Sequence, residues 1–504
     1  MRKRTALFLS IALLFTLFTP LTAYSSLKDT FVFAATADVD SFDPHWGKTT
    51  TSIQQHLNIY DTLLTVDKDM NVVPMLAEKY ERISDVEYMF YLRKGVKFHN
   101  GSEFTAEDVK FSIDRAVANP SCAFIIDFVA KVDVVDKYTV KITTVAPFAP
   151  AFLNLTHPAL GIMSKAYVEP NDNILRTAPM GTGPYKFVSW RQGDRTVLEA
   201  FEDYWGGKPK TQHLIARVIP ESVQRTIALE TGEADLAYDI LPHDADRISR
   251  NPDLKYIDEI SLLTFYFAMN HTNPILSNQL VREAVRQAIN PQPIVDIILS
   301  GRGAVADCII PPKAFGFRND VPKIPHNPEN AKKLLAEAGY PDGFKVRLCT
   351  NEAQIRIEIC QVLQSQLKEI GIDVDFQVFE FGAFIERIDT AAGWDMLLSG
   401  WTTSTADADY TYFAHFHSSK FGPQGNRVFV ALPGMDPLLE AGRASDNPDE
   451  RMRIYGEVEK ILTAESVHRP IAYATFSAGM SAKVQGFELL PNGYHKLSKV
   501  TVEK

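Results

Sequence analysis

The sequence predicts a mixed α/β protein built from more than one folding unit. Short apolar runs with strand-like alternation are interspersed with amphipathic stretches of helical period along most of the chain. This alternation is typical of α/β lobes. The chain has 504 residues, of which 45% are hydrophobic. It is therefore long enough for several domains of roughly 150 residues each and has enough apolar side chains for large cores.

The first 25 residues have the pattern of a secretory signal peptide. A basic segment at residues 2–4 precedes an apolar run at residues 6–18, and the small residues Ala23 and Ser25 offer cleavage sites. The apolar run is too short to span a membrane, which argues against a retained anchor. No cysteine lies near the cleavage region, so a lipid-anchored form is not expected.

The mature chain is expected to be acidic and soluble. The formal net charge is −10, and removal of a leader with three positive charges changes it to −13. An acidic chain is a poor partner for nucleic acid. After the leader, no stretch approaches about 18 uninterrupted apolar residues, so no membrane span is expected.

The cysteines give no metal or redox motif. Cys122, Cys308, Cys349 and Cys360 lack CxxC spacing and any zinc-like pattern. Four cysteines allow three disulfide pairings, and the sequence does not choose among them or exclude free thiols.

The most strongly patterned local segment begins with a strand at residues 89–93. A turn, a short return at residues 96–98 and a second turn at Asn100 and Gly101 follow, since Asn-Gly supplies the positive φ angles of tight turns. Thr105 is then expected to cap a helix, with Asp108 completing a capping box.

The remaining elements follow from period and capping signals. Strands are expected over residues 29–34, 265–270, 372–378 and 395–400, with a hairpin around residues 136–142. Helices are expected over residues 221–231, 281–289, 327–339 and 355–370, because each has a helical apolar stripe or a Gly or Pro at its end.

The sequence carries no recognisable enzyme motif. It lacks a Walker A loop, HExxH, GxSxG and GxGxxG, and its acids and histidines have no catalytic spacing. No catalytic residue and no cofactor are therefore predicted, although a secreted hydrolase remains the alternative from a different class. His415 and His417 would share one side of an expected strand, but two ligands are too few for a structural metal site. No metal site is predicted.

Several segments resemble one family. LRKGVKFHNGSEFTAEDVKFS at residues 92–112 resembles the signature of the extracytoplasmic solute-binding proteins of family 5, which serve dipeptide, oligopeptide and nickel importers of the ATP-binding-cassette (ABC) class. Four further segments resemble sequences of the same family: VDSFDPH at residues 39–45, GTGPY at 181–185, YWGGKPK at 204–210 and VREAVRQAI at 281–289. The resemblance covers essentially the whole mature chain.

The resemblance implies a two-lobed periplasmic-binding-protein fold (type II, cluster C) with an additional inserted domain. By analogy, lobe I comprises residues 26–60, 181–272 and 479–504, the additional domain residues 61–180, and lobe II residues 273–478. It also implies a monomer in the periplasm. Such a protein captures a peptide-like small solute between its lobes and delivers it to the ABC permease in the inner membrane. A metal chelate, a sugar and an opine-like compound remain alternative ligands.

The same resemblance implies a set of ligand-binding residues. Trp46, Thr50 and Thr51 are expected at the edge of the cleft. Phe265 and Asn270 are expected near the hinge, and the others in the second lobe. Arg356 lies near an arginine that dipeptide binders present to the ligand, although a solvated arginine at a helix start is an equal alternative. Trp401 is expected to stack on the ligand or wall it in. The full set is Trp46, Thr50, Thr51, Phe265, Asn270, Arg356, Trp401, Ser404 and Asp407.

The loop after Trp401 departs from the peptide-binding relatives. In those proteins an aspartate three residues after the tryptophan pairs with the amino terminus of the bound peptide, whereas this chain has Ser404 there. Asp407 and Asp409 match acids found later in the loop of the relatives, where they are usually not the amine ligand. The departure argues against ordinary recognition of a free amine.

We therefore predict that Ser404→Asp strengthens binding of di- and tripeptides with a free amine and not of their N-acetylated forms. A carboxylate compensates a buried ammonium through charge-assisted hydrogen bonds. Lack of a buried partner costs about 3–5 kcal/mol, roughly a hundredfold to several thousandfold in dissociation constant. Titration calorimetry measures both affinities. Submicromolar binding by the wild type that acetylation abolishes would show that this loop is assigned wrongly.

Overall fold

A computed structural model describes residues 27–47 and 49–504 of the protein. The signal peptide predicted over residues 1–25 lies outside the described residues. In the part that is described, no helix is long and apolar enough to cross a membrane.

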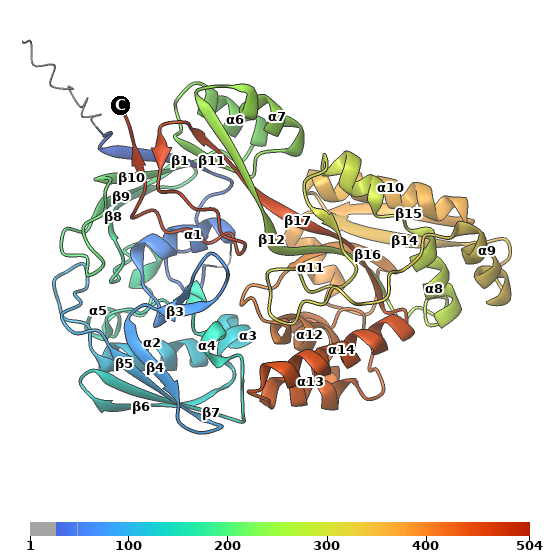
Figure 1. Ribbon diagram of the computed structural model, residues 1–504, viewed down its shortest axis with the longest axis horizontal. Coiled ribbons are helices and arrows are strands. Elements are labelled where there is room, and N and C mark those ends of the chain that lie inside the picture. Colours follow the sequence, from blue (N-terminus) through green and yellow to red (C-terminus); the bar gives the residue numbers. More distant parts are fainter. Residues whose placement is uncertain (1–26, 48) are drawn as a thin grey trace, which may run out of the picture.

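One mixed sheet of 11 strands runs through both lobes (Figure 1). Its strand order is β15-β14-β16-β12-β17-β11-β1-β10-β9-β8, with β13 paired to β17. The strands are β1 (Thr30–Ala35), β8 (Tyr185–Arg191), β9 (Arg195–Ala200), β10 (His213–Val218), β11 (Leu236–Tyr238), β12 (Leu254–Met269), β13 (Ala304–Val305), β14 (Phe344–Asn351), β15 (Ile372–Phe379), β16 (Met396–Thr402) and β17 (His468–Ser481).

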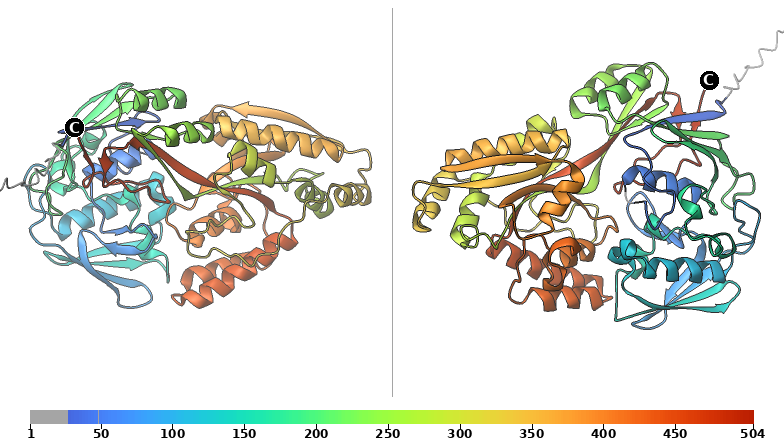
Figure 2. Two further views of the ribbon diagram at one scale, coloured as in Figure 1. Left: turned by 45° about the horizontal axis from the view of Figure 1, so that its top comes forward. Right: turned by 180° about the vertical axis from the view of Figure 1, so that it is seen from behind.

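The long strands β12 and β17 connect the two lobes. They pair antiparallel from Leu254 opposite Ser481 to Ala268 opposite His468. Views from the front and from behind show both strands passing between the lobes (Figures 1 and 2). The ladder shifts register between Ile260 and Thr264 and again after Phe265. The strand predicted at residues 265–270 is therefore only the end of a strand that begins at Leu254.

The additional domain contains a separate four-stranded antiparallel sheet of order β4-β5-β7-β6. The predicted capping box of its main helix is confirmed, because the Thr105 N–H and hydroxyl both donate to the Asp108 carboxylate, at 2.9 and 3.1 Å. The return predicted at residues 96–98 is wrong as a strand, since only a single bridge joins Lys97 to Glu103. The domain's elements are β2 (Leu64–Val66), β3 (Val72–Pro74), β4 (Ala77–Arg82), β5 (Glu87–Leu92), β6 (Val129–Asp136), β7 (Thr139–Thr144), α2 (Ala106–Ala118), α3 (Ala123–Ile126), α4 (Ala151–Asn154) and α5 (Lys165–Val168).

Helices cover the large sheet at both of its ends (Figure 1). The predicted helix at residues 327–339 is confirmed, with Asn327 at its N-cap, Pro328 in its first turn and Gly339 just beyond it at φ +92°. The first lobe has α1 (Thr50–Ile59), α6 (Ser222–Glu230) and α7 (Pro242–Arg250). The second has α8 (Gln279–Ala288), a π-helical turn (Ile294–Ile298), α9 (Pro328–Glu337), α10 (Gln354–Glu369), α11 (Phe381–Ile388), α12 (Ala408–Phe416), α13 (Met435–Ala444) and α14 (Pro448–Ala464). A short hairpin of β18 (Val484–Gln485) and β19 (Thr501–Val502) lies near the C-terminus.

Separate apolar cores accompany these parts. One lies in the additional domain between Leu63 and Ile162. In the second lobe, another packs α8 and α10 against β14, β15 and β16. The predicted helical stripe at residues 281–289 belongs to this second core, where its apolar side chains are fully buried. The exact boundaries given above for the three parts stay a prediction.

The histidine pair predicted on a strand lies elsewhere. His415 is in the last turn of α12, and His417 is the residue that ends this helix. Among the residues described, no three His, Cys, Asp or Glu side chains form a group that could hold a metal ion. The strand prediction fails because an alternating pattern of two residues does not distinguish a strand from the end of a short helix.

No disulfide links any two of the four cysteines in the described chain, and all four are buried. Burial raises the pKa of Cys308 to about 12 and that of Cys349 to about 11. Of the disulfide pairings that the sequence left open, the described structure therefore contains none.

The GTGPY turn returns the chain to the first lobe through a close backbone contact. The Gly183 N–H donates to the carbonyl of Ile59 at 2.9 Å. A Cβ atom at Gly183 would lie 2.5 Å from the Ile59 carbonyl carbon. Only glycine permits this approach at the end of α1, after which Tyr185 enters β8.

We predict that Gly183→Ala lowers the free energy of unfolding by about 1–3 kcal/mol or more, because the added methyl group overlaps backbone atoms. Gly382→Ala in α11 is the matched control, since its Cβ would meet only the flexible Glu380 carboxylate, at 3.1 Å. Its effect should stay within about 1 kcal/mol. Urea denaturation compares the two variants, and equal stabilities would contradict the close contact.

Candidate functional site

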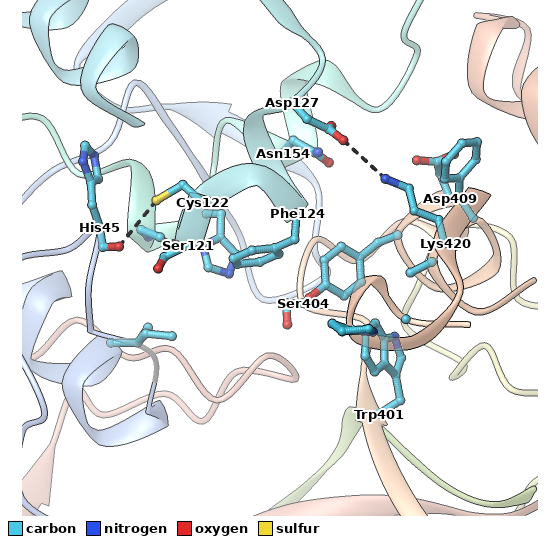
Figure 3. A pocket seen from close by; sticks show the side chains of 18 of the residues that line it. His45, Ser121, Cys122, Phe124, Asp127, Asn154, Trp401, Ser404, Asp409 and Lys420 are labelled. Atoms are coloured by element: carbon cyan, nitrogen blue, oxygen red, sulfur yellow. Dashed lines mark hydrogen bonds and ion pairs between the residues drawn. The ribbon is translucent and has the colours of Figure 1, made fainter. Parts of the chain in front are cut away.

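A cavity of about 380 Å³ lies where the first lobe, the additional domain and the second lobe meet (Figure 3). This volume falls within the range of about 300–1,000 Å³ that is typical of small-molecule sites. Each of the three parts contributes side chains to its wall. Examples are Ile53 and Tyr494 from the first lobe, Phe124 and His157 from the additional domain, and Trp401 and Lys420 from the second lobe.

Trp401 forms part of the wall at the end of β16. Its indole N–H donates to the Thr411 hydroxyl at 3.1 Å. The His415 ring packs against the indole edge to face, with the ring centres 4.3 Å apart, and Tyr410 packs at a tilt, at 5.5 Å. These contacts hold the indole in one orientation, as a rigid apolar surface requires.

Aromatic rings from different parts meet across the cavity. Phe124 of the additional domain lies edge-on to Tyr410 of the second lobe, with ring centres 6.1 Å apart. On the other side, His157 lies edge-on to Tyr494 at 5.9 Å. The protein is therefore in a closed arrangement, in which the lobes touch around the cavity.

Polar contacts also join the additional domain to the second lobe. The Ala149 N–H donates to the carbonyl of Arg443 at 2.8 Å, and Asp127 lies 3.7 Å from the Lys420 ammonium (Figure 3). Farther from the cavity, Arg82 pairs with Asp446 at 2.8 Å. Closure is thus marked by contacts between residues far apart in sequence.

The cavity wall carries more positive than negative charge. Lys420, Arg427 and Arg443 line it, beside the acids Asp127 and Asp409. Asp409 is engaged by Arg443 through two hydrogen bonds of 3.0 and 3.1 Å. Arg427 is paired with Asp389, which does not line the cavity, at 2.8 Å. The wall therefore offers a carboxylate three cationic side chains as donors, although each of them already has an acidic partner.

The histidines of the wall do not add to this charge. Burial lowers the pKa of His157 to about 4. It also lowers the pKa of His45 to about 4, against the opposing effect of Asp43. Both imidazoles are therefore neutral near pH 7. Nδ1 of His45 accepts a hydrogen bond from Arg115 and Nδ1 of His157 accepts one from the Ala159 N–H, so the Nε2–H group of each ring is the donor that remains.

Ser404 lines the cavity. It is the residue that we expect at the position of the amine-binding aspartate of the peptide-binding relatives. Its hydroxyl donates to the carbonyl of Thr402 at 3.3 Å. Asp407 does not line this cavity. Its carboxylate accepts two hydrogen bonds from Arg451, at 2.6 and 2.9 Å, and is almost completely buried. This pairing leaves Asp407 unable to replace the missing acid without breaking a buried ion pair.

The structure separates the other residues of the predicted set. The Trp46 ring is partly exposed and lies under the Arg176 guanidinium, 4.8 Å away, rather than on the cavity wall. Thr50 and Thr51 line a smaller neighbouring cavity. The structure thus brings Trp401 and Ser404 together in the main cavity and places these three outside it.

Three predicted residues lie within or beside the second lobe's core. Phe265 packs in the apolar core that contains α8 and α10. The Asn270 amide donates to the carbonyls of Ala391 and Trp394. Arg356 donates to the Asn351 side chain at 2.9 Å, and burial lowers its pKa. None of these three side chains lines the main cavity.

Most wall residues were not predicted from the sequence. The additional domain supplies Phe124, Asp127 and His157 from short helices and their flanking turns. Lys420 and Arg443 follow Trp401 by 19 residues or more and have no local pattern. Signals existed for Asp409 and Tyr410, at the end of the Trp401 loop, and for His45 in the VDSFDPH segment.

The fold and the cavity define a two-lobed binding protein that encloses a small solute. A family model described as bacterial extracellular solute-binding proteins, family 5 Middle, matches residues 71–423. The glutathione-binding protein GsiB of Salmonella choleraesuis (strain SC-B67) is 32% identical over 474 residues, covering 92% of each protein. The chain belongs to family 5 of the bacterial extracellular solute-binding proteins.

Solved structures agree with this assignment. The periplasmic binding protein DppA of Helicobacter pylori, in complex with the peptide STSA, has a TM-score of 0.84 at 28% identity and covers 95% of this chain and 99% of that chain. AgaA of A. tumefaciens R10, in complex with agropinic acid, has a TM-score of 0.81 at 25% identity, with 94% and 99% covered. The predicted two-lobed α/β fold is confirmed.

The family also decides the class of function. Its members are substrate-binding components of ABC importers and not enzymes, so the hydrolase alternative is excluded. The chain is the substrate-binding component of such an importer.

We predict that Trp401→Ala weakens ligand binding by roughly thirtyfold or more, because loss of a central aromatic contact typically costs about 2 kcal/mol. The loss of affinity should exceed the loss of stability, which arises from the contacts of the indole with Thr411, His415 and Tyr410. Calorimetry measures this with whichever member of the di- and tripeptide panel binds the wild type.

Asp407→Asn is the matched comparison for Trp401→Ala. It leaves Arg451 buried without its charged partner and should cost about 3–5 kcal/mol of stability, while the affinity of the folded protein changes little. Reversed effects of the two variants would assign Trp401 to packing and Asp407 to ligand binding.

Proposed function

We propose that this protein captures a small peptide-like solute with at least one carboxylate and delivers it to its permease. The observation that carries the proposal is the closed cavity, whose wall combines aromatic rings with the cationic side chains of Lys420, Arg427 and Arg443. Members of the same family bind peptides or small ligands, and the GsiB relatives are named for glutathione, a tripeptide-like acid. The volume of about 380 Å³ suits a solute of this size.

The carboxylate would be held by Lys420 and Arg427. Arg443 is already engaged by Asp409, whereas the Lys420 ammonium lies 3.7 Å from Asp127, beyond hydrogen-bond distance. Arg427 donates to Asp389 through Nε at 2.8 Å. Its two terminal nitrogens would donate to the carboxylate of the solute. Charge-assisted hydrogen bonds from such groups are roughly twice as strong as neutral ones.

An amine of the solute would find its partner away from Ser404. Asp127 lines the cavity, and its side chain is 46% exposed, so it can accept a hydrogen bond from an ammonium group while it also attracts Lys420. An amine held by this half-exposed carboxylate remains partly in water, so acetylation of the peptide should weaken binding only modestly. A peptide held through the Trp401 loop would instead lose its binding on acetylation.

The protein would act in the periplasm as a monomer with no nucleic-acid partner. The secretory pattern of residues 1–25 and the periplasmic binding proteins among its relatives support this location. The acidic net charge of −10 disfavours nucleic acid. An opine-like ligand is the second candidate, since the similar protein AgaA was solved with agropinic acid.

A ligand panel tests the carboxylate. Glutathione, di- and tripeptides and their C-terminal amides are titrated into the protein, and amidation should weaken binding by about tenfold or more. Lys420→Met and Arg427→Met should remove this discrimination. Arg453→Met, at an exposed position of α14, is the control with the same change of charge. Equal affinity for acids and amides would overturn the proposal.

We predict that ligand binding reduces the radius of gyration, because binding proteins of this kind bury their solute by hinge closure. Small-angle scattering measures the protein without ligand and with a bound member of the panel. An unchanged radius, with binding confirmed by calorimetry, would contradict closure.

A further inference from the structure

One corner of the main cavity is lined by polar side chains that carry no charge. It is formed by His157 of the additional domain, Ser404 and Tyr410 of the second lobe, and Tyr494 of the C-terminal loop. Within the described chain, no charged side chain forms a hydrogen bond, an ion pair or a ring contact with any of these four residues. We call these four residues the neutral corner.

The charged side chains of the wall gather around a different ring. The Arg443 guanidinium lies over Phe413, 3.3 Å from the ring centre, and the Lys420 ammonium lies 5.6 Å from the same centre. Asp127 pairs with Lys420 at 3.7 Å. Figure 3 shows Lys420 and Asp127 together on one side of the pocket and Ser404 apart from them. The cavity therefore has a charged end and an uncharged end.

His157 offers a hydrogen-bond donor to the neutral corner. Its Nδ1 accepts from the Ala159 N–H at 3.2 Å, at the start of a short turn (Pro158–Leu160). The ring is neutral near pH 7, because burial lowers its pKa to about 4, so its proton is on Nε2. Among the described residues, no acceptor forms a hydrogen bond with this Nε2–H group. The donor is therefore available to a solute in the cavity that His157 lines.

Neighbouring groups hold the His157 ring in one orientation. The Phe124 ring packs edge-on to it on one side, with ring centres 5.6 Å apart, and the Tyr494 ring on the other, at 5.9 Å. The His157 N–H donates to the Asn154 carbonyl at 3.1 Å, and its own carbonyl accepts from the Leu160 N–H at 2.9 Å. Because ring and backbone are both fixed, little conformational entropy is lost when the Nε2–H group binds a solute.

The hydroxyl groups of the neutral corner leave acceptors. The Ser404 hydroxyl donates to the Thr402 carbonyl at 3.3 Å. Burial raises the pKa of Tyr494 to about 12 and also raises the pKa of Tyr410, and a hydrogen bond with Ser404 opposes both shifts. Since the Ser404 hydrogen is already used, its oxygen accepts from the two phenols. The phenolic oxygens then remain as acceptors for a solute.

We propose that the neutral corner binds an uncharged carboxamide group of the solute, an inference that rests on the proposed function of the main cavity. The carboxamide oxygen accepts from the His157 Nε2–H group, and the amide hydrogens are donated to the phenolic oxygens of Tyr410 and Tyr494. A carboxylate has no hydrogen to donate there, and an ammonium group cannot accept one from His157. Either ion would also leave water without a countercharge. The solute is thus charged at one end and carries an amide at the other.

Titration calorimetry with matched dipeptides tests the carboxamide. L-alanyl-L-glutamine should bind the wild-type protein about tenfold more tightly than L-alanyl-L-glutamate, because the glutamate side chain lacks the donor and adds a charge. L-alanyl-L-methionine has an uncharged side chain of similar length without hydrogen-bonding N–H groups. It should also bind about tenfold more weakly than the glutamine peptide.

Variants assign this preference to the neutral corner. His157→Phe and Tyr494→Phe keep an aromatic ring and remove a hydrogen-bonding group. Each should reduce the preference for the glutamine over the methionine peptide to about threefold or less. Tyr167→Phe and His326→Phe make the same changes outside the cavity and should keep the full preference.

Two further measurements accompany the variants. The ring nitrogen signals of His157, identified by their loss in His157→Phe, should shift when L-alanyl-L-glutamine binds. Circular dichroism establishes that each variant is folded. Tyr494→Phe keeps the test valid if His157→Phe, which loses the bond from the Ala159 N–H, does not fold.

Equal affinity for the glutamine and glutamate peptides, or a preference that the variants of the neutral corner retain, would overturn the carboxamide assignment. The C-terminal amide of L-alanyl-L-glutamine is titrated alongside. If amidation leaves its affinity unchanged while the preference for glutamine persists, the carboxylate of the proposed function is wrong and the neutral corner stands. Absence of heat with all three dipeptides at millimolar concentration would overturn both proposals.

Discussion

The paired strands β12 and β17 are the constraint on which the rest of the structure depends. Because one ladder runs through both lobes, its hydrogen bonds hold them together, and its two register shifts interrupt the regular pairing between them. The register shifts at Thr264, and Thr264 is paired with Trp401 on β16. The wall of the main cavity is therefore joined directly to the irregular part of the connection between the lobes.

Arg443 shows how closure and ligand binding share atoms. Its guanidinium engages Asp409 and lies over the Phe413 ring, 3.3 Å from the ring centre, within the cavity wall. Its carbonyl accepts the Ala149 N–H of the additional domain. One residue thus belongs to the wall and to the contact that closes it, so a solute that repositions this wall also changes how well the domains meet.

The fold was largely predictable because its signals are local. The capping box of Thr105 and Asp108 and the stop at Gly339 act within one helical turn, so sequence reasoning places these helices correctly. The site was less predictable because its contacts are distant. Asp407 resembles a ligand-binding loop residue, yet it pairs with Arg451, 44 positions away. Likewise, nothing near Phe124 or Asp127 in the sequence indicates that these residues face Trp401.

The buried thiols have a consequence for how the chain matures. At pH 7 a thiol with the pKa of about 12 found for Cys308 is ionised in roughly one molecule in 10⁵, and only the thiolate attacks a disulfide. Burial raises the pKa of Cys349 as well, to about 11. Once the chain is folded, these two thiols are therefore poor nucleophiles, and thiol exchange that involves them has to precede folding.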